Sequence, residues 1–232
     1  MRLLVFLIPL AALAQEQPHE LIGKVGTRPA LLILHSALRA DGSAQVAGEY
    51  VILPTLARRF VEGERSPELG VTVLKEGSTP ILFGRPPTAE LRGTWREGVY
   101  KGTRLGPGGQ RREEFEFSEE FPALDGLSTN VRCEAKDARY QSRLSLAIEK
   151  GALKSLEWRV VEPGGQACSV SAAEQRPMRG ALRFVAGGCR LTLRDAGELL
   201  ALRAENCAAQ CEADAHWGWL FIDKRGNCEL LP

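Results

Sequence analysis

The sequence lacks the motifs that mark the common catalytic sites. It contains no G-x-S-x-G nucleophile elbow, no H-E-x-x-H, no phosphate-binding G-x-x-x-x-G-K-[ST] and no G-x-G-x-x-G. Its three histidines are scattered along the chain, which argues against a hydrolytic triad. We therefore expect a protein without enzymatic activity.

The chain also lacks a strong net charge. It has 30 basic and 29 acidic residues, so no positive excess is available to attract nucleic acid or an anionic lipid surface. Charged residues make up 25% and hydrophobic residues 44% of the chain, which is ordinary for a globular protein. We expect neither nucleic acid nor an inserted membrane among its partners.

No apolar run reaches the roughly 18 residues that a membrane span needs. The longest, Leu3–Ala14, follows the basic residue Arg2 and ends in the small residues that a signal peptidase reads. We predict that residues 1–14 are a signal peptide cleaved near Ala14 and that the chain is exported in soluble form, periplasmic or secreted. The alternative is a buried N-terminal helix.

Cysteine is missing from the first 132 residues, so the predicted cleavage site has no cysteine to carry a lipid anchor. An even number of cysteines in an exported chain favours disulfides. Their uneven distribution predicts two parts, residues 20–120 without disulfides and residues 127–232 stapled by them. The six are Cys133, Cys168, Cys189, Cys207, Cys211 and Cys228.

The segments that are present read as short β-strands. Residues 29–35 are a continuous apolar run of strand length, and residues 46–53 alternate between apolar and polar. Similar segments at residues 143–151 and 153–162 follow in the second part, and Gly187-Gly188 is a hairpin-turn signal. Period-two alternation with frequent turn signals predicts an all-β fold of two antiparallel β-barrel or sheet domains.

Three glycine–aromatic pairs recur in the first part. Gly48-x-Tyr50, Gly93-x-Trp95 and Tyr100-x-Gly102 each place both residues on one face of a strand. A glycine there leaves a gap that an aromatic ring can cover, and it lets the sheet bend sharply. The pairs are what the closing of a small barrel requires.

These segments resemble known exported domains. About residues 20–118 are similar to a repeated-hairpin β-domain of exported bacterial proteins. The segments that carry this resemblance are LIGKVGTRPALLIL, GEYVIL, VTVLKE, ILFG and LRGTWREG. The prolines in GRPPTAEL depart from the pattern of that domain. The second part resembles a small β-domain of bacterial envelope proteins in the segments ACSVSA, GGCRLTLR and NCAAQC. Glu212 stands where that domain has a glycine after the last cysteine. The chain is also similar to small β-barrel lysozyme inhibitors. The first two resemblances imply a fold and an envelope location.

The stretch NCAAQCEADAHWGW, residues 206–219, offers a metal site as one interpretation. Cys207, Cys211 and His216 supply two sulfurs and a nitrogen, and Asp214 a fourth ligand. A structural zinc site usually has a second ligand pair elsewhere, which is missing here. Thiols in an oxidising compartment become disulfides, and C-x-x-x-C is not the spacing of a redox motif. We expect no metal and no cofactor.

The disulfide interpretation carries a geometric condition. Residues four apart on a helix have Cβ atoms roughly 5–6 Å apart, whereas a disulfide needs roughly 3.5–4.5 Å. The alanine-rich stretch favours a helical turn. Either the turn is distorted and Cys207 pairs with Cys211, or each pairs with a strand cysteine. The set we favour is Cys207–Cys211, Cys168–Cys189 and Cys133–Cys228.

Two groups of side chains are candidate binding or catalytic residues. Trp217 and Trp219 share one face of a strand. If the two rings are exposed, they are expected to stack on a sugar ring or a peptide. The alternative is that they pack in the core. Glu114 and Glu116 lie on the face opposite two phenylalanines. They form either a solvated strand face or, with a cleft, the carboxylates of a glycosidase.

Three functions follow from these observations. The first is a non-enzymatic binding or structural protein of the bacterial envelope, with an unknown glycan or protein partner bound by Trp217 and Trp219. The second is an inhibitor of a wall-degrading enzyme such as lysozyme, whose cleft receives the loop at residues 105–113. The third is a polysaccharide hydrolase that depends on Glu116.

Overall fold

The structure of the chain is a computed structural model. It describes residues 18–40, 42–53, 55–66, 70–79, 86–136, 141–162, 164–172, 180–186, 189–211, 219–223 and 225–231. The predicted signal peptide, the Gly187-Gly188 turn, Asp214, His216 and Trp217 lie outside these residues. Within the described ranges the chain forms β-strands and short 3-10 turns without an α-helix, which confirms the all-β prediction.

The strands fall into two groups along the chain. The first group is β1 (His19–Val25), β2 (Arg28–Leu38), β3 (Ala44–Ile52), β4 (Ala57–Arg65), β5 (Val71–Gly77), β6 (Ala89–Arg96), β7 (Val99–Leu105) and β8 (Arg112–Ser118). The second is β9 (Thr129–Lys136), β10 (Gln141–Glu149), β11 (Ala152–Val161), β12 (Ala167–Ala172), β13 (Ala181–Ala186), β14 (Cys189–Asp195), β15 (Leu199–Glu205), β16 (Trp219–Asp223) and β17 (Cys228–Leu231). The 3-10 turns are η2 (Pro107–Gly109) and η3 (Ala208–Gln210).

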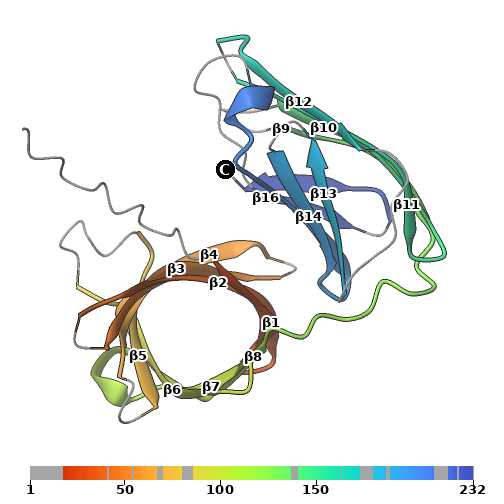
Figure 1. Ribbon diagram of the computed structural model, residues 1–232. Helices are drawn as coiled ribbons and strands as arrows, with labels where there is room; N and C mark the ends of the chain where they lie inside the picture. Colours follow the sequence, from red (N-terminus) through yellow and green to blue (C-terminus); the bar gives the residue numbers. More distant parts are fainter. Residues whose placement is uncertain are drawn as a thin grey trace, which may run out of the picture.

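The first eight strands form a closed antiparallel barrel, seen end-on in Figure 1. Each strand pairs with the next, and β1 pairs with β8 to close the ring. Side chains alternate along a strand, so one face of every strand points inward. The inward residues include Leu32, Tyr50, Leu91 and Phe117, all nearly without exposure. The interior is therefore a packed core, as expected of an eight-stranded barrel.

Glycines allow the barrel wall to bend. A Cβ atom on Gly48 would lie 1.9 Å from the carbonyl oxygen of Ile33, and one on Gly102 would lie 2.0 Å from that of Arg92. Gly93 meets its neighbouring strand in the same way. Because no side chain fits at these positions, neighbouring backbones approach closely and the sheet curves. The structure agrees with the predicted role of the glycine–aromatic pairs in closing a barrel.

The second group of strands forms two antiparallel sheets that pack face to face, and we call this pair of sheets the sandwich. One sheet has the order β12-β11-β10-β9 and the other β13-β14-β15-β16-β17. Their inner faces share a core that contains Leu146, Trp158, Leu193 and Leu202. Figure 1 shows the sandwich beside the barrel.

All six cysteines are paired in disulfides, and they lie in the sandwich as predicted. Cys133–Cys228 joins β9 to β17 and so ties one sheet to the other, in agreement with the favoured set. The other two predicted pairs are wrong. The structure has Cys168–Cys211 and Cys189–Cys207 in place of Cys207–Cys211 and Cys168–Cys189.

Strand pairing explains the corrected connectivity. Arg190 of β14 lies opposite Glu205 of β15, which brings Cys189 and Cys207 together beyond the end of that ladder, with Cα atoms 4.1 Å apart. Cys211 forms an isolated bridge with Cys168 of β12, with Cα atoms 4.0 Å apart. The turn η3 between Cys207 and Cys211 thus sends each cysteine to a different strand, which was the second of the two geometric alternatives.

The barrel is docked onto the sandwich through the outer faces of both. Leu31, Ile33 and Val51 point out of the barrel, yet at most 3% of each is exposed. They pack in one apolar cluster with Trp219 and Phe221, which point out of the sheet β13–β17. The middle of this run, residues 30–34, is continuously apolar because that part of β2 is buried on both faces.

Replacing Gly48 with alanine is expected to lower the free energy of unfolding by about 2–3 kcal/mol, because the new methyl group forces two paired strands apart. Chemical denaturation followed by circular dichroism measures the loss. Gly164→Ala is the matched control, since its Cβ would meet no atom within 4 Å. Equal stability of the Gly48 variant and the unmodified protein would contradict this packing of the barrel.

Candidate functional site

Trp219 is not an exposed ligand-binding residue. It is 7% exposed, and it belongs to the apolar cluster between barrel and sandwich, where its ring stacks on Phe221 at 5.9 Å between centroids. The prediction that it stacks on a ligand is therefore wrong for Trp219, and core packing is what the structure shows. Trp217, its predicted companion, lies outside the described residues.

The glutamates of β8 divide between its two faces. Phe115 and Phe117 point into the barrel, and Glu114 and Glu116 are exposed on the outside. Glu116 lies between Lys24 of β1 and Lys101 of β7 in the strand register. This exposure fits a solvated strand face, and Glu114 and Glu116 also line a hollow of about 680 Å³ on the barrel wall, so the glycosidase interpretation stays a prediction.

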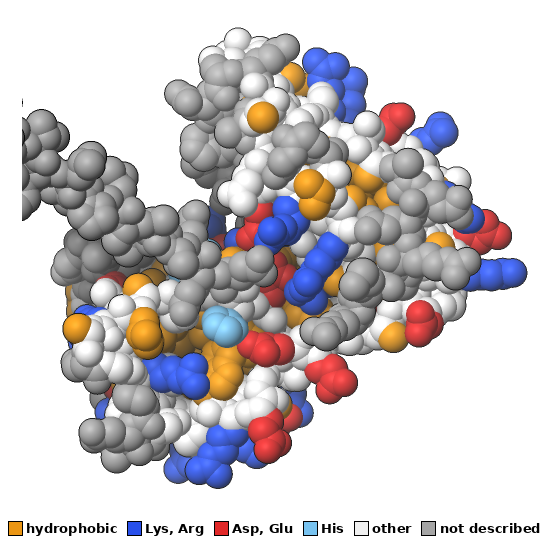
Figure 2. All heavy atoms as spheres, in the orientation of Figure 1, with side chains coloured by type: hydrophobic (Ala, Val, Ile, Leu, Met, Phe, Trp, Pro, Cys, Tyr) orange, Lys and Arg blue, Asp and Glu red, His pale blue; other side chains and the backbone are white. Residues whose placement is uncertain are grey.

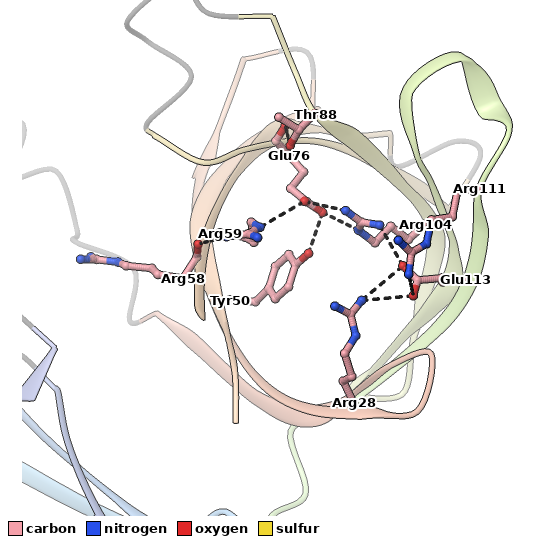
Figure 3. A network of polar contacts seen from close by, with 9 residues as sticks. All are labelled: Arg28, Tyr50, Arg58, Arg59, Glu76, Thr88, Arg104, Arg111 and Glu113. Carbon is pink, nitrogen blue, oxygen red and sulfur yellow. Dashed lines mark hydrogen bonds and ion pairs between the residues drawn. The ribbon is translucent and has the colours of Figure 1, made fainter. Parts of the chain in front are cut away.

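A buried polar network occupies one end of the barrel (Figure 3). Its centre is the carboxylate of Glu76, which is 0% exposed. Tyr50 Oη donates to Glu76 Oε2 at 2.6 Å, and Arg104 donates to both carboxylate oxygens, from Nε at 2.7 Å and from Nη2 at 2.8 Å. Arg59 Nε lies 3.7 Å from Glu76 Oε1. Both oxygens of this buried carboxylate are thus satisfied.

Arg104 continues the network to a second carboxylate. Its Nη1 donates to Glu113 Oε2 at 2.9 Å, and Arg28 donates to the same carboxylate at 3.2 Å (Figure 3). Burial by itself would raise the pKa of Glu76, but the hydrogen bonds from Arg104 and Tyr50 and the charges of Arg104 and Arg59 outweigh it and hold that pKa below its ordinary value. The network spans this end of the barrel and pairs both carboxylates with arginines.

Strand alternation carried a signal for this network. Arg104 follows Tyr100 and Gly102 at intervals of two, so it shares their inward face. Glu113 likewise precedes Phe115 and Phe117 at intervals of two. The prediction that Glu114 and Glu116 lie opposite the two phenylalanines is confirmed, whereas the inward position of Glu113 was not predicted.

A second cluster of charges lies where barrel and sandwich meet, and Figure 2 shows basic and acidic side chains gathered there. On the sandwich side, Arg183, Thr192 and Arg203 form one cross-strand row on β13, β14 and β15. Arg190 and Arg194 lie on β14 at either side of Thr192 along the same face. Alternation places these residues outward because Leu182, Leu193 and Leu202 fill the sandwich core.

Glu20 of the barrel is held between two of these arginines. Arg194 Nε donates to Glu20 Oε2 at 2.5 Å, and Arg203 Nη1 donates to Glu20 Oε1 at 2.8 Å. The side chains are 9%, 14% and 7% exposed for Arg194, Arg203 and Glu20 respectively. The guanidinium of Arg194 also lies 4.1 Å from the ring centroid of Phe121. We call this group, Glu20 with Arg194 and Arg203, the Glu20 clamp.

A pocket of about 220 Å³ opens beside the Glu20 clamp, and we call it the junction pocket. Its lining is Pro18, Glu20, Arg183, Arg190, Thr192, Arg194 and Glu205. Glu205 is already engaged by Arg203 at 3.0 Å. Among the residues that the structure describes, Arg183 and Arg190 form no ion pair, although Glu205 lies opposite Arg190 in the strand register.

The charge of Arg203 also acts on His35, which lies on the outer face of β2. Burial and the charge of Arg203 lower the pKa of His35, and the opposing charges of Glu205 and Glu49 do not restore it. The guanidinium groups of Arg183 and Arg190 are well suited to carboxylate and phosphate oxygens.

Comparison with protein-family models, with curated proteins and with solved structures finds no match to this chain. The resemblances to exported β-domains therefore stay predictions. In the part of the chain that the structure describes, no helix is long and apolar enough to cross a membrane, and no three His, Cys, Asp or Glu side chains are grouped to hold a metal ion.

Acid is expected to destabilise the barrel through Glu76. The folded-state pKa of Glu76 lies below its ordinary 4.5, so its contribution is fully present above that value and is lost as the pH falls through the folded pKa. Glu76→Gln is expected to cost about 3 kcal/mol at pH 7, because Arg104 loses its buried partner, and the cost should shrink toward pH 3.

Denaturation midpoints of the protein and of Glu76→Gln between about pH 3 and 7 measure this dependence. The exposed Glu116→Gln is the control and should follow the unmodified protein. If Glu76→Gln also follows it throughout, the network does not stabilise the barrel.

Proposed function

We propose that the chain is an exported, non-enzymatic binding protein of the bacterial envelope or extracellular space, and that it holds a ligand by a carboxylate or phosphate group in the junction pocket. Three disulfides support export, since they form and persist in oxidising compartments. The predicted signal peptide at residues 1–14 belongs to the same proposal.

The observation that carries the ligand assignment is the pair Arg183 and Arg190. Both line a concave surface, and neither has an acidic partner among the described residues. The two acids of the pocket, Glu20 and Glu205, are neutralised by arginines that lie beside them. An oxyanion is the ligand chemistry that completes such a site, because charge-assisted hydrogen bonds to guanidinium groups are among the strongest in proteins.

The surroundings of the pocket are rigid, which favours binding. Arg183 and Arg190 project from paired strands, and Cys189, beside Arg190, is joined to Cys207 by a disulfide. The Glu20 clamp fixes the barrel wall against the same sheet. Groups that are already ordered lose little conformational freedom when a ligand arrives.

The volume limits the ligand. About 220 Å³ is below the roughly 300–1,000 Å³ of pockets that enclose a drug-sized molecule. The pocket therefore suits a small organic acid or phosphate, or the charged end of a larger molecule. The barrel interior is not an alternative ligand site, because it is filled by apolar side chains and by the network around Glu76.

Isothermal titration of the full chain with inorganic phosphate and with succinate tests the proposal. We expect millimolar or tighter binding of at least one of them, weakening with added salt. In Arg183→Gln/Arg190→Gln the affinity should fall at least about tenfold, because hydrogen bonds to charged groups contribute about 1.5–3 kcal/mol each.

Arg225→Gln provides the matched control, because Arg225 is exposed and forms no ion pair with a described residue. It should bind both anions as the unmodified protein does. Absence of binding at about 10 mM of either anion, or equal binding by the double variant, would refute an oxyanion site at the junction.

A further inference from the structure

A hollow lies on the outer face of the sheet β9–β12, away from the junction pocket. Its volume is about 720 Å³, within the range of pockets that bind small molecules. The junction pocket belongs to the opposite sheet of the sandwich, so the two surfaces are separate.

Charged side chains of both signs line this hollow. Arg132, Arg143 and Arg159 contribute three positive charges, and Glu134 and Glu157 contribute two negative ones. Glu134 is engaged by Gln141 and Arg143. Arg132, Arg159 and Glu157 form no ion pair with a residue that the structure describes. The hollow therefore offers donors and acceptors with almost no excess charge.

Hydroxyl and amide groups complete the lining. Ser145, Ser169 and Ser171 lie between the charged residues in the strand register, and Gln210 of η3 reaches the rim. A hydroxyl both donates and accepts a hydrogen bond, and carboxylate, amide and guanidinium groups present two or more acceptors or donors in one plane. Such groups match the neighbouring hydroxyls of a sugar ring.

The shape of this sheet is fixed from both edges. The edge strand β9 is joined by Cys133–Cys228 to β17, and the edge strand β12 by Cys168–Cys211 to the chain after η3. Beneath the hollow, the indole Nε1 of the buried Trp158 donates to Ser142 Oγ at 2.8 Å. The surface is thus ordered before any ligand binds, which lowers the entropic cost of binding.

The same features argue against other ligand classes. The backbone groups of β10 and β11 are used in ladders on both sides, so a peptide cannot be added as a further strand there. Three arginines against two glutamates provide too small a positive excess for a phosphate backbone. A neutral, hydroxyl-rich molecule is the class that the surface fits.

We propose that the hollow on the outer face of β9–β12 binds a segment of an uncharged oligosaccharide, with Glu157 and Arg159 as the residues that contact its hydroxyls. This is a second site, and it does not depend on anion binding at the junction pocket. Lectin domains built on antiparallel sheets show that this class of architecture supports sugar recognition.

The test is titration of the full chain, followed by isothermal calorimetry, with linear hexasaccharides of glucose, N-acetylglucosamine and mannose. At least one should bind with a dissociation constant below about 1 mM, with little dependence on salt. In Glu157→Gln/Arg159→Gln that affinity should fall at least about tenfold, since the charged hydrogen-bond partners are lost.

Two controls isolate the site. Lys154 lies on the same strand as Glu157 and Arg159 but does not line the hollow. The variant Lys154→Gln should therefore bind the sugar as the unmodified protein does. Arg183→Gln/Arg190→Gln should also retain sugar binding, which separates this proposal from the junction pocket. The proposal is overturned if none of the three hexasaccharides binds at about 10 mM. It is also overturned if Glu157→Gln/Arg159→Gln binds as the unmodified protein does, or if the chain binds only an acidic oligosaccharide such as oligogalacturonate.

Discussion

The position of the barrel relative to the sandwich depends on one buried carboxylate, that of Glu20. It is the only acid among the described residues that accepts from both Arg194 and Arg203. Removing one partner from a buried ion pair leaves an uncompensated charge and costs about 3–5 kcal/mol, whereas an exposed pair contributes at most about 1 kcal/mol. The Glu20 clamp therefore adds directional specificity to the apolar cluster around Trp219, which by itself would bury area without fixing an orientation.

The two parts reach stability by different physical means. The barrel closes because glycines such as Gly48 and Gly102 let its strands approach, and the network around Glu76 satisfies the charges at one end. The sandwich has its edges tied by disulfides. One face of the sheet β13–β17 is then divided: Ala201, Trp219 and Phe221 are covered by the barrel, and Arg183 and Arg190 stay open to a ligand.

Much of the fold could be predicted from local patterns, because strand alternation, turn glycines and the glycine–aromatic pairs are properties of neighbouring residues. Two of the three disulfides could not be predicted from local patterns. The pairing of Cys189 with Cys207 depends on the register of β14 against β15, and that of Cys168 with Cys211 depends on a bridge between distant segments. Alternation pointed to Arg104 and Glu113 as inward residues, but their meeting with Glu76 depends on barrel closure. The apolar residues 30–34 were a sign that both faces of this part of β2 are covered. The junction pocket joins strands that are far apart in the sequence, so no local pattern reveals it.

A double-mutant cycle between Glu20 and Arg194 tests the docked arrangement most directly. The free energies of unfolding of the protein, Glu20→Ala, Arg194→Ala and the double variant give the coupling energy of the pair. Docking through the Glu20 clamp predicts a coupling of at least about 1.5 kcal/mol, as expected for a close and buried charge pair. A coupling near zero, the value expected for an exposed pair such as Arg112 and Glu114, would show that barrel and sandwich are not joined in this way, and it would remove the basis for the junction pocket.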